Sequence, residues 1–278
     1  MCKSLREFVR DENDEVIISY GQVVREERFF CAVLFHLLIS DLGFLDSFLK
    51  KCGVLEVDLS EVRVFIEYAM ARDLWNSMEG HENVNHNRVL FLKEYVPSLK
   101  EYIPKDFNSD SIREFNQRLV AGPSLSNRFI QSPGCWSMEK VESLILGGEC
   151  EVEGACMLKW AFNIKPDIVI EYSNNHAVCI EAKVESDEDM YKFENRYKIT
   201  AKQTEVQKFL MKKILGYETK HVFLRNSNKE SRRGSNEKEL CLSWTEVFPA
   251  KTNGILNVDE NPMVKMAKKR LLKISGGK

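Results

Sequence analysis

Two short runs of β-branched residues, separated by a turn, constrain the fold of this chain more than any other feature. Residues 166–171 and 177–184 are rich in valine and isoleucine, and the turn-forming sequence Tyr-Ser-Asn-Asn-His lies between them. This pattern predicts a β-hairpin. In the first run Ile168, Val169 and Ile170 are consecutive, so both faces of that strand are apolar. Strands of this kind lie in sheets that are covered on both faces, which predicts an α/β fold.

The register of this hairpin brings charged residues together. A turn centred on Asn174 pairs Asp167 with Glu181, and directly opposed side chains have Cβ atoms roughly 4.5–5.5 Å apart. Strand alternation places Lys183 on the same face as Glu181. A β-bulge would shift the pairing by one residue. Without a bulge, two carboxylates and one ammonium converge at one end of the hairpin.

Such a set of side chains suits metal-assisted hydrolysis of a phosphodiester bond. Two close carboxylates raise each other's pKa unless a cation lies between them, and Mg²⁺ takes one or two carboxylates together with water and phosphate oxygens. The metal polarises the phosphate and lowers the pKa of a bound water, and a lysine can hold that water or oppose charge that develops on phosphorus. The alternative is a surface ion pair, which contributes little to stability. Residues 178–184 are apolar enough to be buried, and this favours a functional role for the charges.

At these positions the chain resembles the PD-(D/E)xK nuclease superfamily, which has the restriction-endonuclease-like fold. Pro166 and Asp167 match the PD element, and Glu181, Ala182 and Lys183 match the (D/E)xK element. The resemblance implies a mixed β-sheet flanked by helices. It also implies Asp167 and Glu181 as ligands of Mg²⁺, for which Mn²⁺ can substitute, and Lys183 as the residue that acts on the attacking water.

The resemblance covers residues 165–244 and one helix upstream, and it implies a glutamine on the helix after the motif. The sequence predicts that helix over residues 199–215, with Gly216 at its C-terminal cap. Gln203 is the preferred candidate, because it belongs to an inward-facing apolar stripe, and Gln207 is the weaker one. The other members of the stripe are Ile199, Val206, Leu210 and Ile214. The alternative for Gln203 is an amide that only fills a polar gap.

The superfamily also implies a glutamate on a helix that precedes the PD strand, and two residues compete for this role. Glu27 lies in a very apolar helix predicted over residues 21–39, where it shares a stripe with Val23, Phe30, Leu34 and Leu38. Glu142 lies on a shorter helix nearer the motif. Glu27 is preferred as a catalytic residue and metal ligand, because a carboxylate beside so apolar a helix requires compensation.

This choice sets the predicted domain organisation. Residues 1–40 contribute the first core helix, residues 41–160 form a mainly helical insertion, and residues 161–278 hold the nuclease core and a basic tail. Two further strands are predicted at residues 221–225 and 239–244. The predicted architecture is therefore an α/β core with a mixed sheet and a mainly helical inserted region.

Cations are clustered even though the formal net charge is only −2. Such clusters can neutralise phosphates, although taken alone they are better explained as a solvated basic helix and a disordered loop. The C-terminal cluster contains Lys265, Lys268, Lys269, Arg270, Lys273 and Lys278. The loop cluster contains Arg225, Lys229, Arg232, Arg233 and Lys238.

Other features indicate a cytoplasmic protein that does not enter a membrane. No apolar run approaches the ~18 residues of a membrane span, and the first residues lack the apolar core of a secretory signal. The eight cysteines are scattered, as reduced core thiols are. His81 and His86 lack cysteines at zinc-ligand spacing and are expected in a solvated loop.

The sequence therefore predicts a Mg²⁺-dependent nuclease, with DNA preferred as substrate, in a restriction or phage-defence role. Double-strand cleavage would favour a homodimer or a partner protein bound through the helical region. One alternative is a catalytically silent copy of the fold that serves as a DNA-binding or assembly subunit. Another is an unrelated α/β protein whose hairpin charges form a surface ion-pair ladder.

Overall fold

The fold is built on a five-stranded mixed sheet. The computed structural model describes residues 26–122, 127–184, 188–194, 196–226, 240–248 and 261–276. The strand order is β1-β2-β3-β6-β7, with β1 antiparallel to β2, β2 antiparallel to β3, and the pairs β3–β6 and β6–β7 parallel. The strands are β1 (Arg63–Ile66), β2 (Ile168–Ser173), β3 (His176–Ala182), β6 (Glu218–Arg225) and β7 (Leu240–Ser243). The predicted α/β class, with a mixed sheet between helices, is confirmed.

The β2–β3 hairpin has the predicted register. Ile168 pairs with Ile180, and Glu171 pairs with Ala177. The irregularity in the pairing lies beyond Glu171, at the turn, and therefore does not shift the strand ends that carry the predicted site. Asn175 adopts a φ of 68° in this turn, a left-handed conformation that asparagine tolerates better than most residues.

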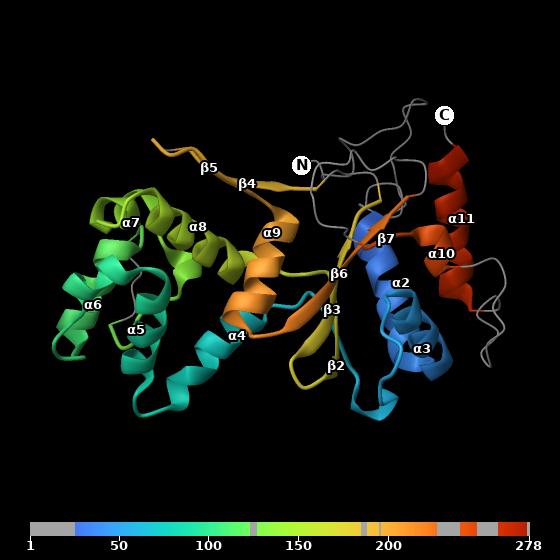
Figure 1. The fold of residues 1–278 in the computed structure, drawn as a ribbon, viewed down its shortest axis with the longest axis horizontal. Coiled ribbons are helices and arrows are strands. Elements are labelled where there is room, and N and C mark those ends of the chain that lie inside the picture. Colours follow the sequence, from blue (N-terminus) through green and yellow to red (C-terminus); the bar gives the residue numbers. More distant parts are fainter. Residues whose placement is uncertain are drawn as a thin grey trace, which may run out of the picture.

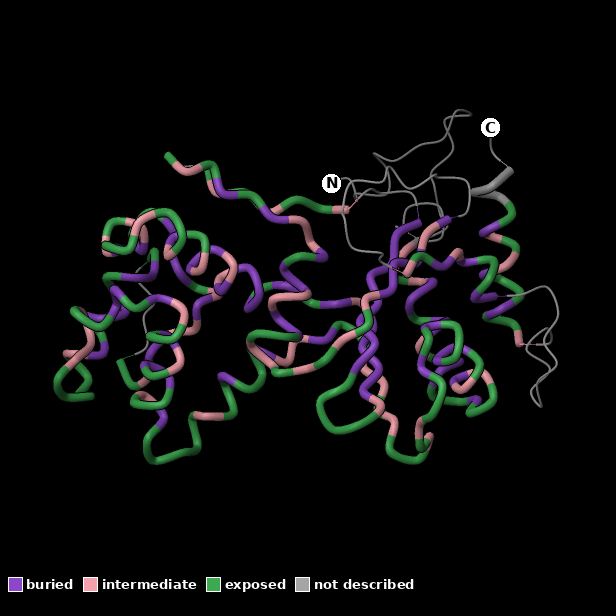
Figure 2. Tube along the Cα trace, in the orientation of Figure 1, coloured by how far each residue is buried: buried purple, intermediate pink, exposed green. Residues whose placement is uncertain are grey.

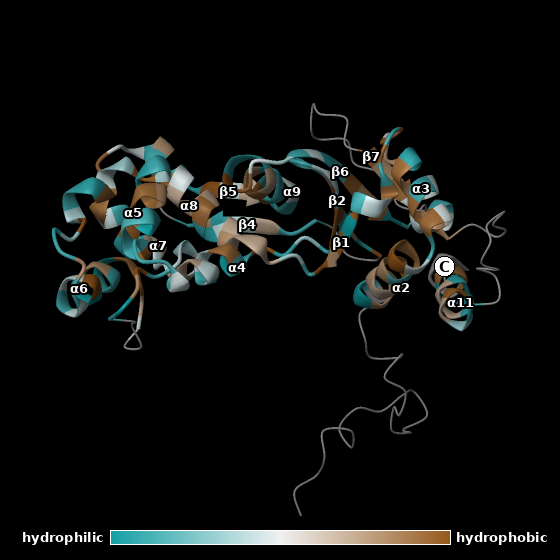
Figure 3. Cartoon of the chain, turned by 90° about the horizontal axis from the view of Figure 1, so that it is seen from below, coloured by the Kyte–Doolittle hydropathy of each residue, from teal (hydrophilic) through white to brown (hydrophobic). Residues whose placement is uncertain are grey.

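One face of the sheet is covered by α2 (Glu26–Ser40), α3 (Leu42–Lys51), α10 (Trp244–Val247) and α11 (Pro262–Gly276) (Figure 1). Helix α2 is the very apolar helix expected over residues 21–39, of which residues 21–25 lie outside the described part. It is covered on several sides, because α3, β1 and α11 all contact it. Figure 3 shows the hydrophobic α2 beside α11. Even-numbered residues of the hairpin, such as Ile168 and Ile180, pack into this layer.

The other face of the sheet is covered by α8 (Glu149–Asn163), by α9 (Gln203–Lys208) and by a π-helical turn, Phe209–Ile214, that continues α9. Gly216 follows with a φ of 74°, as its predicted capping role requires. Odd-numbered hairpin residues, including Val169 and Cys179, pack into this layer. Buried residues run through the central strands in Figure 2.

A helical lobe extends from this second layer (Figure 1). It contains α4 (Met70–Ser77), α5 (Val84–Tyr95), α6 (Ser109–Leu119) and α7 (Met138–Leu144), with short helical turns at Met78–Gly80, Pro97–Tyr102 and Pro133–Cys135. A further turn, Leu59–Glu61, lies beside β2 and packs against the first layer instead. Buried Arg88 holds the lobe together, because its guanidinium donates to the carbonyl oxygens of Trp75 and Ile130.

Two sequence expectations differ from this fold. Residues 42–66, assigned to a helical insertion, contribute α3 and the edge strand β1 to the sheet layers instead. The helix expected from Ile199 begins at Gln203, because residues 199–202 form strand β5 (Ile199–Lys202), which pairs with β4 (Met190–Phe193). Ile199 and Ala201 are buried and Thr200 is exposed, so the local period is that of a strand.

In the described part of the chain, no single helix has both the length and the apolarity of a membrane span. Helices α2 and α3 meet both criteria only when they are taken together, and the chain bends by 115° between them.

The cations expected in the loop at positions 229, 232, 233 and 238 lie outside the described residues.

Candidate catalytic site

The end of β3 carries a buried ion pair. Glu181 and Lys183 are 1% and 6% exposed, and the Lys183 Nζ lies 2.7 Å from Glu181 Oε1. The backbone of Lys183 is fixed on both sides, since its N–H donates to the Leu224 carbonyl oxygen and its own carbonyl oxygen accepts from the Trp244 indole. The backbone of the lysine is therefore held in place directly after the end of β3.

Asp167 joins this pair from the neighbouring strand. It directly precedes β2, and its Oδ2 accepts a hydrogen bond of 2.8 Å from the N–H of Ala182, the residue between Glu181 and Lys183. The hairpin register, continued by one residue, places Asp167 opposite Glu181. The predicted convergence of these three residues is thus present in the structure.

Glu27 reaches the same cluster from the start of α2. Its Oε1 lies 3.5 Å from the Lys183 Nζ, and its side chain is 26% exposed. Glu142 lies elsewhere, with its Oε1 3.5 Å from Arg196 Nε. Of the two competing glutamates, the structure brings Glu27 to the predicted acids.

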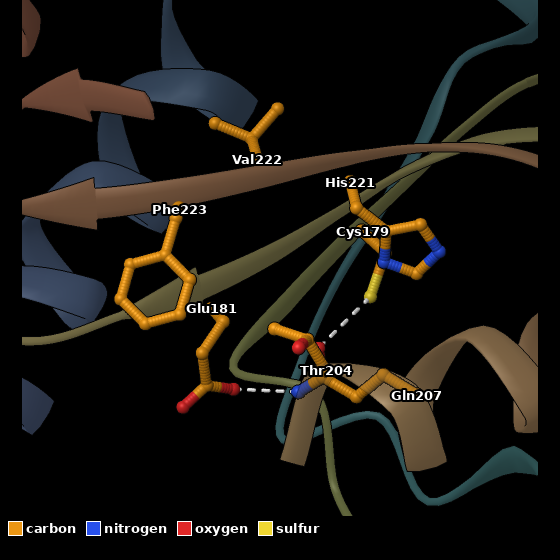
Figure 4. Close-up of a pocket in the computed structure, with 7 residues that line it drawn as sticks. All are labelled: Cys179, Glu181, Thr204, Gln207, His221, Val222 and Phe223. Carbon is orange, nitrogen blue, oxygen red and sulfur yellow. Dashed lines mark hydrogen bonds between the residues drawn. The ribbon is translucent and has the colours of Figure 1, made fainter. Parts of the chain in front are cut away.

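The glutamine that contacts the cluster is Gln207, whereas the sequence favoured Gln203. The buried Gln207 Nε2 donates to Glu181 Oε2 over 2.5 Å, and its Oε1 lies 3.8 Å from the Cys179 Sγ (Figure 4). These groups line a small pocket together with Thr204 and with the β6 residue Phe223 (Figure 4).

Gln203 opens α9, and its backbone N–H donates to the Asp189 carbonyl oxygen. The error arose because the helix starts four residues later than expected. Its inward stripe therefore begins one turn further along the chain.

Burial and neighbouring charges shift the pKa values of Asp167, Glu181 and Lys183. Burial raises the pKa of Asp167 to about 8, with help from the charge of Glu181 and against the opposing Ala182 N–H and Lys183. Burial also raises the pKa of Glu181, although Lys183 and Gln207 oppose the shift. Burial lowers the pKa of Lys183, but Glu181, Glu27 and Asp167 together raise it by more. The lysine therefore stays charged.

The cluster has more acid than base, with three carboxylates against one ammonium, and its oxygen donors suit a hard divalent cation. In the described ranges no group of three or more histidine, cysteine, aspartate or glutamate side chains is arranged to hold a metal. A cation held by Asp167 and Glu181 would thus need water or substrate oxygens to complete its shell. Mg²⁺ commonly binds in this way.

Comparisons of the chain with family models, with curated proteins and with solved structures give no match. The site geometry therefore carries the functional argument.

The raised pKa of Asp167 makes stability depend on pH when no metal is present. The ordinary pKa of this group is 3.8, and in the folded state it is about 8. Between these two pH values the folded state binds more protons than the unfolded state, so the free energy of unfolding falls as pH rises. The slope from this group is at most about 1.4 kcal/mol per pH unit. We expect Asp167→Asn to flatten the curve and to be more stable than the wild type at pH 8. Urea unfolding in EDTA between pH 5 and pH 8 measures this.

Asp106→Asn provides the control, because Asp106 is exposed and lies in the helical lobe. It should follow the wild-type curve. A wild type and an Asp167→Asn variant with parallel curves would contradict the assignment of a buried, protonated Asp167.

Proposed function

We propose that this chain is a divalent-metal-dependent nuclease of the PD-(D/E)xK type that hydrolyses phosphodiester bonds, with DNA as the preferred substrate. The observation that carries the proposal is the buried cluster at the end of β3. Glu181 and Lys183 lie 2.7 Å apart, and Asp167 is hydrogen-bonded to the residue between them. A surface ion-pair ladder does not account for charges buried to this degree.

Each residue of the cluster has a distinct part in this proposal. Asp167 and Glu181 would hold the divalent cation, which when bound supplies Lewis-acid polarisation of the phosphate and a more acidic water. Lys183 would position the attacking water and oppose negative charge on the phosphate. Gln207 fixes the rotamer of Glu181 through its hydrogen bond, and Glu27 limits the movement of the Lys183 ammonium.

The architecture supports the same proposal at a coarser level. A mixed sheet with helices on both faces is what a restriction-endonuclease-like fold requires, and the charged residues lie at the ends of the two strands that carry the motif. A cytoplasmic role in restriction or phage defence follows from the resemblance rather than from the site. The helical lobe offers a surface for a partner or a second copy.

A catalytically silent nuclease fold that binds DNA is the second candidate. The observation in its favour is that Glu181 already has Lys183 and Gln207 as partners, so the described acids are partly satisfied without a metal. This candidate predicts binding of nucleic acid without cleavage.

Cleavage separates the two candidates. We expect the protein to cleave plasmid, linear duplex DNA, single-stranded DNA or RNA in MgCl₂ and not in EDTA. Lys183→Met keeps most of the side-chain volume and removes the ammonium, so it should lower the rate roughly a hundredfold or more. Gel analysis of time courses measures both effects.

Lys93→Met is the matched control, because Lys93 is exposed on α5 in the helical lobe, and it should retain wild-type activity. Absence of metal-dependent cleavage on all four substrates would refute the enzyme and leave the silent candidate.

Metal binding gives a test that does not depend on cleavage. Saturating Mg²⁺ or Mn²⁺ should raise the melting temperature of the wild type, since a ligand at a hundred times its Kd stabilises by about 2.7 kcal/mol. The Asp167→Asn/Glu181→Gln double variant should show no shift. Because the cation competes with the proton on Asp167, whose pKa is about 8, affinity should weaken as pH falls below that value. Thermal-shift titrations at pH 6.5, 7.5 and 8.5 measure the trend.

Asp106→Asn/Glu82→Gln removes two exposed acids and should leave the metal-dependent shift intact. An equal shift in the wild type and in the Asp167→Asn/Glu181→Gln variant would place any bound cation elsewhere.

A further inference from the structure

The β4–β5 hairpin is an arm that connects the candidate site with the helical lobe. It lies directly after the motif strand in the sequence, and in Figure 1 it runs above α9 and α8. It forms a two-stranded sheet separate from the main one. Tyr191 lies on Trp160 of α8, with ring centroids 5.5 Å apart, and Arg196 lies 3.5 Å from Glu142 of α7.

The base of the arm is fixed relative to the site. The Glu188 carboxylate accepts hydrogen bonds from both the backbone N–H and the hydroxyl of Thr204, and the Asp189 carbonyl oxygen accepts from the Gln203 N–H. Gln203 and Thr204 belong to helix α9, which also carries Gln207, the residue that contacts Glu181. Burial raises the pKa of Tyr191, and the charges of Glu181 and Asp189 raise it further while Lys183 opposes them.

The two faces of the arm differ in character. On the inner face Tyr191, Phe193, Ile199 and Ala201 pack against the core of the second layer. On the outer face, Met190 pairs with Lys202 and Lys192 pairs with Thr200. These four outer positions include two cations and no acid, and the exposed acids Asp189 and Glu194 flank the paired segments. At the tip, exposed Lys198 adds positive charge, whereas exposed Arg196 is paired with Glu142.

We propose that the outer face of the β4–β5 arm binds the phosphodiester backbone of a nucleic acid and guides it toward Asp167, Glu181 and Lys183. This proposal rests on the proposed nuclease function, since it names the surface on which that substrate lies. Charge complementarity supports it, because the two lysines of the outer face lie among neutral side chains and each can contact a phosphate of the backbone. Continuity with the site also supports it, because β5 leads directly into the helix that carries Gln207.

Binding measured without metal tests the arm separately from catalysis. Fluorescence anisotropy in EDTA would follow labelled duplex DNA, single-stranded DNA and RNA of one length at several salt concentrations. Lys192→Gln/Lys202→Gln should weaken binding roughly tenfold or more and lower the salt slope by about 0.9 for each cation removed. Lys93→Gln/Lys105→Gln removes two exposed lysines of the helical lobe and should leave both quantities unchanged.

A variant that is expected to bind more tightly distinguishes a direct effect on binding from a loss of binding that is caused by misfolding. Thr200→Lys adds a cation to the outer face opposite Lys192 and should tighten binding severalfold with a steeper salt slope, whereas Thr200→Glu should weaken binding. Wild-type affinity and slope in the Lys192→Gln/Lys202→Gln and Thr200 variants would overturn the arm proposal, even if the protein cleaves DNA. Failure of the wild type to bind any of the three nucleic acids would also overturn it. Arm-dependent binding without cleavage would support the arm and refute the enzyme.

Discussion

The antiparallel pairing of β2 with β3 is the constraint on which the rest of the structure depends. A shift of one residue in this register would turn every side chain of one strand to the opposite face. It would move Asp167 away from the Ala182 N–H and would exchange the side chains that pack into the two apolar layers. The irregularity in the hairpin lies at the turn, where it leaves the far strand ends unaffected. The site is therefore positioned by the same pairing that builds the core.

The two faces of the hairpin also explain how charges come to be buried. Even-numbered residues pack under α2, and odd-numbered residues pack under α8 and α9. Glu181 and Lys183 are odd-numbered, so strand alternation places them on the face that the second layer covers, where both are buried. Glu27 reaches Lys183 from the start of α2 and Gln207 reaches Glu181 from α9. Both helical layers thus contribute one polar side chain to the same pair.

The sequence predicted this hairpin well because its information is local. β-branched residues, a turn and the alternation of side chains set the pairing without reference to the rest of the chain. The predicted start of α9 was wrong, because the sequence there fits two patterns. Ile199, Val206 and Leu210 fit a helical stripe, and Ile199 and Ala201 fit the alternation of a strand equally well. Strand β4 was missed, and the place of β1 in the sheet depends on pairing with β2, about a hundred residues later in the chain. Gln207 was named as the weaker candidate, and the correct helix start was needed to prefer it over Gln203.

The cluster at the end of β3 has an energetic cost that the fold alone does not justify. An ion pair between two apolar layers loses hydration, and hydrophobic residues of similar size are often at least as stable in such positions. The cluster also holds more carboxylates than ammonium groups, so the charge of Lys183 does not offset burial, which raises the pKa of Asp167 and of Glu181. Glu171, by contrast, is buried on the neighbouring strand β2 with Tyr68, Tyr217 and Arg63 as partners. The chain can therefore satisfy a buried carboxylate fully, and the excess of acid beside Lys183 is the feature that a divalent cation would relieve.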